Sequence, residues 1–328
     1  MNRSRCCLIA AAVLAAVPAT AQNLTLYSGR GETLVSPIVA AFTEETGIEV
    51  DVRYAGTSEL AVLLQEEGEA SPADLFWSQD PGALGAVADL LAELPAEITD
   101  LVPSALRDDE GRWIATSGRQ RVLVVSTERV EEEEIPESIL DLTGEEYRGR
   151  VGWAPTNGSF QLHVTAMREA LGEEETREWL EAMVANEAVV FSNNAAIVQG
   201  IADGEADFGL VNNYYLPRFL ASDPEFPVRI AHFADGDVGN LLSVAAIGIT
   251  ASSDQQEEAA AFVEFLLSPQ AQQYFASQVK EYPVTSSVVL DSDQPTLDML
   301  ETSAPDIDLN SLSDLEGTLE LLREAGLL

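Results

Sequence analysis

The sequence predicts an α/β fold in two lobes, and three observations lead to this prediction. Strand-like and helix-like segments alternate along the chain, which is typical of parallel strands joined by crossover helices. The 328 residues exceed the usual size of one core but suit two domains of ordinary size. Hydrophobic residues make up 46% of the chain, which is enough to build real cores and argues against disorder.

Residues 1–21 are predicted to form a signal peptide. Arg3 and Arg5 precede a short apolar run that ends in Ala19-Thr20-Ala21, the small-x-small pattern of a signal peptidase site. Cleavage is expected before Gln22. The apolar run is too short to span a bilayer stably, so the mature protein is expected to be soluble and exported.

The only cysteines, Cys6 and Cys7, fall within this leader. They lie before or at the start of the apolar run, whereas a lipid-anchor cysteine would follow it, so a lipoprotein is not expected. Because the mature chain then has no cysteine, disulfides, thiolate zinc sites and thiol nucleophiles are excluded.

The chain is strongly acidic, with a formal net charge of -39 from 17 Lys and Arg against 56 Asp and Glu. Nucleic acid is not expected as a partner, because phosphate backbones require a basic surface. The acidic residues are interpreted as a solvated shell suited to a salty medium. The alternative, that they attract cations, stays open.

The first part of the chain begins with a predicted strand at 24–29 and a helix at about 32–45. The helix is indicated by the spacing of its apolar residues, and Gly47 is expected to end it. A half-buried strand at 48–55 and a capped helix at 57–69 follow. A third strand at 73–78 precedes the segment 80–91.

The middle of the chain repeats this pattern and predicts a second α/β lobe. An apolar strand at 241–250 and a long amphipathic helix at 253–277, interrupted near Pro269, then indicate a return to the first lobe. The elements predicted for the second lobe are strands at 150–155, 188–192 and 207–212 and helices at 160–171, 173–185 and 195–205.

Four short segments with polar side chains fall where predicted strands end. In open α/β sheets, ligands bind beyond the carboxyl ends of strands, so all four segments could face one cleft. They are "YSGRGE" (27–32), "FWSQDPG" (76–82), "PTNGSF" (155–160) and "NNYY" (212–215).

The segment "PTNGSF" leads from a strand into a helix. The backbone N–H groups of Asn157, Gly158 and Ser159, together with the serine hydroxyl, could therefore form an anion seat at the helix N-terminus. A plain helix cap explains the same residues.

Tyr214 and Tyr215 are adjacent, so in a straight strand they would point to opposite faces, one to the core and one to the surface. If the chain turns there, both phenols could enter the cleft as phenolates. A phenol with a pKa of about 10 ionises only beside a strongly polarising cation, and Fe(III) is the common biological cation that suits oxygen ligands.

In order and spacing, the chain resembles the periplasmic ferric-ion-binding proteins of bacterial ABC iron importers. The resemblance implies the two-lobed type II periplasmic binding protein fold, with a ligand cleft between the lobes. It also implies a monomeric, non-enzymatic periplasmic receptor that delivers a ferric ion or small ferric chelate to the membrane subunits of an ABC permease. The motifs that carry it are "LYSGRGE", "FTEETGIEV", "ADLFWSQ", "SGRQRVLVVSTERV", "GRVGWAPTNGSF", "SNNAAIVQGIADGEADFGLVNNYY", "EYPV" and "LLREAGLL".

The resemblance implies that Tyr214 and Tyr215 bind the ferric ion. In the best-known branch of the family a histidine and a glutamate complete the protein ligands, but the matching positions here are Gly31 and Gln79. Other branches use a further tyrosine, and Phe160 stands near that position. An anion must therefore supply coordination sites that the chain does not.

Carbonate and phosphate are the two candidate anions. Arg30 and Arg119 are candidates to hold carbonate through paired guanidinium contacts. The family's phosphate-holding segments are matched by the residues Asn157, Gly158, Ser159, Asn194 and Asn212.

Asp80, Gln79 and Glu32 are candidate additional metal ligands because they lie at or beside the vacant positions. Capping of helix starts is the alternative role for Asp80 and Glu32. His163 and His232 lie far from the matched positions and are interpreted as structural.

Two further alternatives are weighed. The same fold could bind an organic phosphonate, phosphate ester or carboxylate without metal. An enzyme is not expected, because no nucleophile elbow, phosphate loop or zinc-ligand cluster occurs. Lobe 1 is predicted to comprise 22–120 and 244–295, and lobe 2 is predicted to comprise 121–243 and 296–328.

Overall fold

The computed structural model describes residues 23–290 and 295–328. The predicted signal peptide and both cysteines lie outside the described residues. Within the described ranges, nine strands form one sheet in the order β2-β1-β3-β9-β4-β7-β5-β6, and β8 pairs with β4. The mixed α/β architecture predicted from the alternating segments is confirmed.

The first part of the chain forms parallel βαβ units, as predicted. β1 pairs in parallel with both β2 and β3, so the carboxyl ends of β1 and β3 lie at the same edge. The elements are β1 (Leu24–Ser28), α1 (Glu32–Thr46), β2 (Val50–Tyr54), α2 (Thr57–Glu67), β3 (Leu75–Ser78), α3 (Pro81–Gly85) and α4 (Ala96–Thr99).

The ends of α1 and α2 show how local sequence sets the boundaries. α1 ends at Gly47 as predicted, because Gly47 adopts φ 77°, a left-handed conformation that costs glycine little. α2, predicted as a capped helix, has glycines at both caps, and the Gly68 amide donates to the Leu64 carbonyl at its C-terminal end. Its N-cap is Gly56, which has no side chain, and the Thr57 hydroxyl instead accepts a hydrogen bond from the Gln79 amide at 3.2 Å.

The second group of strands is also built on parallel pairs. β5 pairs in parallel with β6 and β7, and the turn after β7 contains the two adjacent tyrosines. The elements are β5 (Val151–Trp153), α5 (Gly158–Leu171), α6 (Glu173–Ala185), β6 (Val189–Val190), α7 (Asn194–Asp203), β7 (Phe208–Asn212), α8 (Leu216–Ser222) and β8 (Val228–Ala231).

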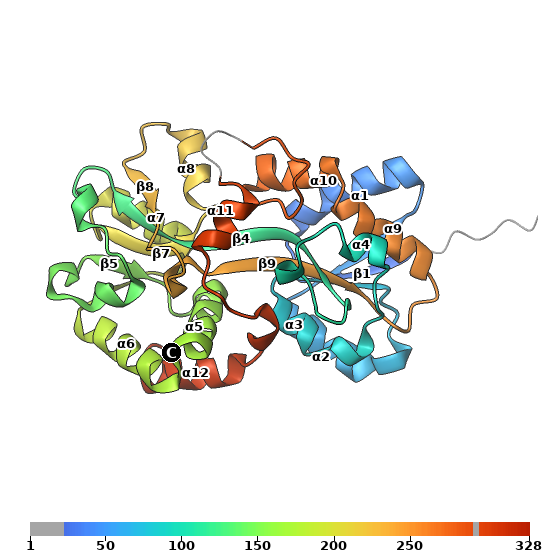
Figure 1. The fold of residues 1–328 in the computed structure, drawn as a ribbon, viewed down its shortest axis with the longest axis horizontal. Coiled ribbons are helices and arrows are strands. Elements are labelled where there is room, and N and C mark those ends of the chain that lie inside the picture. The colour runs from blue at the N-terminus through green and yellow to red at the C-terminus, as the bar shows by residue number, and fades with distance from the viewer. Residues whose placement is uncertain (1–22, 291–294) are drawn as a thin grey trace, which may run out of the picture.

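Two long strands connect the two groups. β4 (Ile114–Ser126) pairs antiparallel with β9 (Leu242–Ile249) through its first half and with β7 and β8 through its second half. Figure 1 shows both strands crossing the middle of the molecule between the two sets of helices. All thirteen residues of β4 are buried, so a connection by strands rather than a flexible tether holds the two groups together.

The hydrophobic clusters divide along β4. One cluster surrounds Trp77 and Phe262, whose ring centroids lie 6.4 Å apart, and it draws on β1, β3, β9, α1 and α9. A second cluster surrounds Trp153 and Trp179, whose centroids lie 6.2 Å apart. A third, around Ile197, packs α7 against β7 and β4. Each group of strands therefore has its own core.

The C-terminal part of the chain packs against both groups of strands. The predicted break near Pro269 is confirmed, because α9 (Gln256–Leu266) ends before it and α10 (Pro269–Tyr274) begins at it. α11 (Leu297–Ser303) and α12 (Leu315–Glu324) follow, joined by residues 304–314, which we call the strap.

The strap joins α3 of the first group to α5 of the second (Figure 1). A Cβ at position 82 would lie 2.6 Å from the Leu312 carbonyl oxygen, so only glycine allows the strap to approach α3 this closely. On the other side, Arg168 of α5 donates to the Asp314 carboxylate at 2.8 Å.

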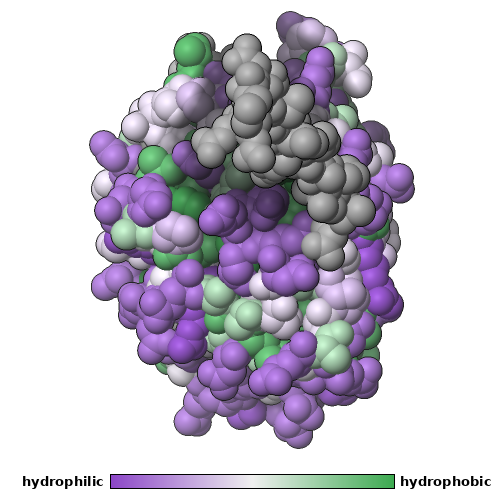
Figure 2. All heavy atoms as spheres, turned by 90° about the vertical axis from the view of Figure 1, so that its right-hand side faces the viewer, coloured by the Kyte–Doolittle hydropathy of each residue, from purple (hydrophilic) through white to green (hydrophobic). Residues whose placement is uncertain are grey.

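The surface agrees with the acidic composition. Hydrophilic side chains cover most of the face seen in Figure 2, with smaller apolar patches between them. No helix in the described ranges is both long enough and apolar enough to cross a bilayer.

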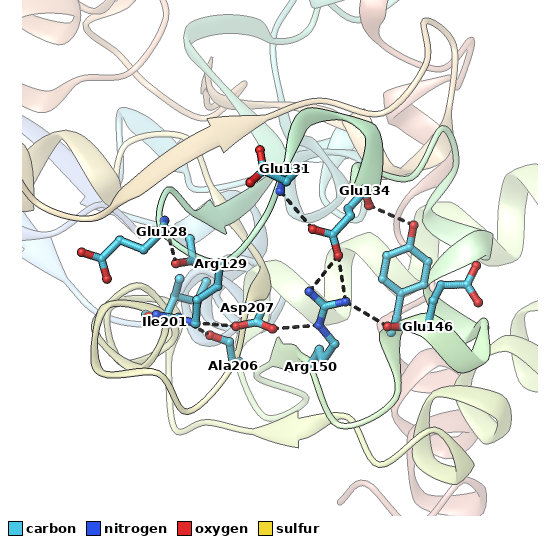
Figure 3. Close-up of polar contacts among 11 residues, drawn as sticks. Glu128, Arg129, Glu131, Glu134, Glu146, Arg150, Ile201, Ala206 and Asp207 are labelled. Atoms are coloured by element: carbon cyan, nitrogen blue, oxygen red, sulfur yellow. Dashed lines mark hydrogen bonds and ion pairs between the residues drawn. The ribbon is translucent and has the colours of Figure 1, made fainter.

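A network of ion pairs ties the outer ends of β4, β5 and β7 together (Figure 3). Asp207 accepts from Arg129 Nε and Arg150 Nε, each at 2.7 Å, and Arg150 also contacts Glu134 Oε1 at 3.1 Å. Burial raises the pKa of Asp207, but the two arginines outweigh it and hold the pKa below its ordinary value. Asp207 is therefore the central anion of the network.

We expect Asp207→Ala to lower the free energy of unfolding by about 2–3 kcal/mol, because two guanidiniums lose their shared partner. The figure is below that of a fully buried pair, because both arginines are about one-third exposed. The native pKa of Asp207 lies below its unfolded value of about 3.9. The contribution of Asp207 to the free energy of unfolding is therefore complete above pH 3.9 and decreases below it.

Urea unfolding at pH 7 and pH 3.5 measures both effects. Glu324→Ala is the matched control, because Glu324 pairs with Arg177 at 3.0 Å on the exposed surface. The control is expected to change stability by less than about 1 kcal/mol. Equal losses for the two variants would contradict a structural role of the network.

Candidate functional site

A cleft of about 550 Å³ lies between the two groups of strands. Residues from α2 and α3 line it on one side, and residues from the start of α5 and the turn after β7 line it on the other. All four polar segments at strand ends contribute to its wall. Their lining residues are Gly29, Gln79, Asp80, Gly82, Asn157, Gly158, Ser159, Tyr214 and Tyr215.

The two tyrosines lie on a turn and not in a strand. β7 ends at Asn212, and the Tyr215 amide donates to the Asn212 carbonyl at 3.2 Å, which closes the turn before α8 begins. The two rings are 4.7 Å apart between centroids and tilted by 30°. Because the chain turns here, both phenols can face one cavity, which would not be possible in a straight strand.

The side chain of Asn213, the first residue after β7, stabilises the turn. The side chain of Asn213 accepts from the Gln120 amide at 3.0 Å and donates to the Lys280 carbonyl at 3.2 Å. β4 and the segment after α10 thus fix the turn from two directions. Both tyrosines are positioned by the crossing strand and not by α8 alone.

The environment of the tyrosines is largely dry and cationic. Tyr214 is 8% exposed, and its hydroxyl accepts from Asn212 Nδ2 at 3.2 Å. Burial and the neighbouring Tyr214 raise the pKa of Tyr215 to about 12. The guanidinium of Arg218 lies 5.0 Å and 5.3 Å from the two ring centroids, within cation–π range. The Tyr215 phenol is therefore protonated at neutral pH unless a cation displaces its proton.

Arg119 lines the cavity, as expected for an anion-holding group. It is 4% exposed, and its Nη2 donates to the Gln79 backbone carbonyl, whereas its Nη1 has no partner within residues 23–290 and 295–328. Burial lowers the pKa of Arg119, and Tyr214 acts in the opposite direction. A buried guanidinium with a free Nη1 is suited to bind an anion in the cavity.

Arg121 is a site residue that the sequence-based prediction missed. It lies two residues after Arg119 on β4, so both side chains leave the same face of the strand. Its Nη1 donates to Ser159 Oγ, Asn194 Oδ1 and Asn212 Oδ1, each at 3.2 Å. The spacing Arg-x-Arg in "SGRQRV" is the signal that could have identified it.

The Arg121 guanidinium is only partly satisfied. In the part of the chain that the structure describes, its Nε and Nη2 are buried without partners. Burial lowers the pKa of Arg121 to about 10, and both tyrosines act in the opposite direction. A cation in this position favours the anionic form of the two phenols beside it.

The start of α5 and the start of α7 surround Arg121 with polar groups. Asn157 caps α5 by accepting from the Ser159 amide at 3.0 Å, so the plain cap is present. Asn194 Nδ2 donates to Asn157 Oδ1 at 3.1 Å and to Ser159 Oγ at 3.2 Å. Asn194 and Asn212 therefore contact Arg121 and lie outside the cavity lining, while Asn157, Gly158 and Ser159 face the cavity.

Asp80 and Gln79 line the cavity opposite the tyrosine turn. Asp80 caps α3 by accepting from the Ala83 amide at 3.2 Å, which is the alternative role expected for it. Burial raises the pKa of Asp80, while Arg119 acts in the opposite direction. Asp80 therefore both caps α3 and lines the cavity.

Arg30 and Glu32 are not brought to the cavity wall. Arg30 Nη2 pairs with Glu281 Oε2 at 2.7 Å, and Ser117 donates to the same oxygen at 2.6 Å. Glu32 is exposed at the start of α1. Gly31, at the position of the family's histidine, is exposed at the N-cap of α1.

Phe160 and His163 are core residues, whereas His232 is exposed directly after β8. Phe160 packs edge-on against Trp153 with centroids 5.6 Å apart and is 1% exposed. His163 is fully buried, its Nε2 lies 2.9 Å from the Val238 carbonyl, and burial lowers its pKa to about 3. Partial desolvation by its neighbours lowers the pKa of His232 although the residue is exposed. In the described part of the chain, no three His, Cys, Asp or Glu side chains gather at one point.

A comparison with protein families gives one match. The model for bacterial extracellular solute-binding proteins matches residues 71–304, which is more than half of the chain. The chain belongs to this family. The two-lobed fold with a cleft between its lobes, predicted from the resemblance, is therefore confirmed together with the family itself.

Two relatives of this solute-binding protein carry names that state a ligand. The major ferric iron-binding protein of Neisseria meningitidis serogroup A is 33% identical over 332 residues, covering 98% of each chain. The Fe(3+)-binding periplasmic protein of Serratia marcescens is 32% identical, covering 94% of this chain and 91% of that protein.

A solved structure agrees with the fold along nearly the whole chain. The crystal structure of iron-bound HitA from Pseudomonas aeruginosa superposes with a TM-score of 0.83 at 32% identity. The match covers 93% of this chain and 99% of that chain.

Proposed function

We propose that this solute-binding protein captures Fe(III) between its lobes through the phenolates of Tyr214 and Tyr215. The observation that carries the proposal is the pair of phenols on one turn, 4.7 Å apart between ring centroids, beside a cavity and two buried guanidiniums. Phenolate oxygen is a hard donor that suits Fe(III). The ferric names of two relatives at 32–33% identity support the same ligand.

Charge balance supports an anion that enters the site together with the cation. Arg119 and Arg121 leave the unloaded site with buried positive charge, and two phenolates formed on binding neutralise it. The cation then brings three positive charges that an anion in the cavity must partly balance. Arg119 Nη1, which has no partner, is positioned to bind that anion.

Ligands other than the two tyrosines must complete the coordination sphere of the iron. Fe(III) prefers about six hard ligands. Carbonate or phosphate would bind to Arg119 and to the helix start at Asn157–Ser159. The Asp80 carboxylate would become a metal ligand when it no longer caps α3. Gln79 also lines the cavity, but it is the weaker candidate because its side-chain amide oxygen carries no charge, unlike a carboxylate.

Delivery to the membrane subunits of an ABC permease completes the proposal. Lobe 1 would comprise 22–120 and 244–295, and lobe 2 would comprise 121–243 and 296–328, acting as a periplasmic monomer. The division of the hydrophobic clusters between Ala115 and Val122 supports the first boundary. Leu312 of the strap packs in the hydrophobic cluster of the first lobe, and Asp314 at its end pairs with Arg168 of the second lobe. The strap would therefore stay in contact with both lobes when they close.

Proton release tests the proposal. Tyr215 is protonated at neutral pH because its pKa is about 12, and a phenolate is required for coordination. Binding must therefore release its proton, and the apparent affinity for iron should rise about tenfold per pH unit for each phenol proton released. Calorimetry of the same ferric chelate in buffers of different ionisation enthalpy counts these protons.

Tyr215→Phe is expected to release one proton fewer per iron bound than the natural protein. Equal proton release from both proteins would show that Tyr215 stays a phenol and would contradict its role as a ligand.

One observation favours a second candidate function. Arg119, whose Nη1 has no partner among the described residues, and Ser159 both line the cavity and suit an organic phosphonate, phosphate ester or carboxylate bound without metal. Calorimetry with such anions in the presence of a strong iron chelator distinguishes the two functions. Tight binding under these conditions would favour the second candidate.

A further inference from the structure

Three buried arginines gather around the middle of β4, and one buried carboxylate lies among them. Within the described ranges, Arg30 and Arg119 are each 4% exposed, Arg121 is 3% exposed and Glu281 is 4% exposed. The other buried acidic residue of these ranges, Asp74, precedes β3 and lies away from the cavity at the carboxyl end of that strand. Among the buried side chains described, Glu281 is therefore the carboxylate that can offset these guanidiniums.

The crossing strand fixes Glu281 on the side of Arg119. Ser117 and Arg119 lie two positions apart on β4, so their side chains leave the same face of the strand. Ser117 Oγ donates to Glu281 Oε2 at 2.6 Å. Gly118 exchanges two backbone hydrogen bonds with Tyr282, each of 2.7 Å. Glu281 is thus held on the face of β4 from which Arg119 reaches the cavity wall.

Glu281 is ionised and attracts two of the arginines. Its Oε2 also accepts from Arg30 Nη2 at 2.7 Å. Burial raises the pKa of Glu281, but Arg30 and Arg119 outweigh it and hold the pKa below its ordinary value. Burial lowers the pKa of Arg119, whereas Tyr214 and Glu281 act in the opposite direction. One carboxylate therefore serves two guanidiniums, and only one of these lines the cavity.

The charge of Glu281 affects what the cavity binds without iron. Three buried guanidiniums without a counter-charge would attract phosphate or a carboxylate on their own. Glu281 weakens this attraction, because an anion at Arg119 Nη1 is repelled by the carboxylate behind that arginine. A ferric ion in the cavity removes the limit, because its positive charge attracts the anion directly.

We propose that Glu281 is a specificity-determining residue that makes anion binding depend on Fe(III). It is the resident counter-charge of Arg30 and Arg119, so the empty cavity holds anions weakly and the ferric ion supplies the missing attraction. Glu281 does not line the cavity and acts through Arg119. This inference rests on the proposed function and explains how the site would distinguish Fe(III) with its anion from an anion alone.

Calorimetry of inorganic phosphate with the iron-free protein tests the proposal. Deferoxamine, a cationic chelator, removes iron without competing for the anion site. We expect Glu281→Gln to bind phosphate at least about tenfold more tightly than the natural protein, because a buried negative charge is lost while an oxygen acceptor is kept. Arg30→Gln is expected to bind phosphate more weakly than the natural protein, because Glu281 then acts on Arg119 alone. Loss of packing could not produce effects of opposite sign.

The double variant Arg30→Gln, Glu281→Gln keeps the test independent of folding. Glu281→Gln leaves Arg30 buried without its anion, which lowers stability. The double variant leaves no such charge, and it should bind phosphate more tightly than Arg30→Gln does. Glu67→Gln is the matched control, because Glu67 accepts from the Tyr27 hydroxyl at 3.0 Å and does not line the cavity. The control is expected to bind phosphate like the natural protein.

Chelator competition for iron at increasing phosphate concentrations gives a second measurement. The apparent ferric affinity of the natural protein should rise with phosphate, because the two ligands favour each other's binding. The rise should be smaller in Glu281→Gln, because phosphate already occupies the cavity before iron enters.

The outcomes separate this inference from the proposed function. Equal phosphate affinities of Arg30→Gln and the double variant would overturn the inference, as would tight binding of phosphate by the natural protein without iron. A lower phosphate affinity in all three variants would also overturn it, because loss of structure would explain the result. Absence of ferric binding at every phosphate concentration would contradict the proposed function, whereas the iron-free affinities test the effect of Glu281 on their own.

Discussion

Replacing Tyr214 or Tyr215 with phenylalanine is expected to lower the affinity for Fe(III) by more than about 100-fold. Loss of a group that merely orients a metal ligand costs about 10- to 100-fold, so loss of a ligand should cost more. The rings stay in place, because the turn is closed by the Tyr215 amide and by Asn213 and not by the phenol oxygens. Competition with a chelator of known ferric affinity measures the change.

Tyr54→Phe is the control for this prediction. Its hydroxyl lies 3.3 Å from Ser36 Oγ on the first lobe, away from the cavity lining. The control is expected to bind iron like the natural protein. If Tyr214→Phe and Tyr215→Phe also bind iron normally, the phenols are not ligands.

Replacing Arg121 with methionine is expected to weaken ferric binding by about 2–5 kcal/mol, or roughly 30- to several-thousand-fold. Arg121 is 3% exposed, and it would provide the buried positive charge beside the two phenolates in the loaded protein. Without it, the pKa of Tyr215 should rise further, because a cation that favours ionisation is lost. Chelator competition and ultraviolet titration of the phenols measure the two effects.

The stability of the iron-free Arg121→Met variant separates this role from a structural one. Two nitrogen atoms of Arg121 are buried without partners among the described residues, so removal of the guanidinium removes a desolvation cost. It also removes the three hydrogen bonds from Nη1 to Ser159, Asn194 and Asn212. Because these two effects oppose each other, the thermal midpoint should change little while iron affinity falls. Arg121→Lys, which keeps the charge, should restore part of the affinity. A fall in the midpoint with unchanged iron affinity would contradict the assignment.

Much of the fold follows from local signals in the sequence. Gly47 ends α1 and Pro269 separates α9 from α10, because each has a backbone preference that context rarely overrides. α6 begins and ends at the predicted residues. β4 was missed as an element because it is buried on both faces along its length, so its residues show no alternation of polar and apolar side chains.

The site is less predictable, because its geometry depends on contacts between distant segments. The tyrosine pair was identified from the chain, but Arg121 became a site residue only through Ser159, Asn194 and Asn212, which lie 38 to 91 positions away. Arg30 illustrates the opposite case. Its partner Glu281 lies 251 positions away, and that pairing keeps the guanidinium from the cavity.

The visible absorption spectrum of the mature protein, recorded before and after addition of ferric citrate, tests the central claim most directly. Phenolate bound to Fe(III) gives a visible charge-transfer band, and the two tyrosines of the turn are its proposed source. We predict a new band in the natural protein that disappears in the Tyr214→Phe, Tyr215→Phe double variant. The same band in both proteins, or no band in the natural protein, would contradict the assignment of iron to these phenols.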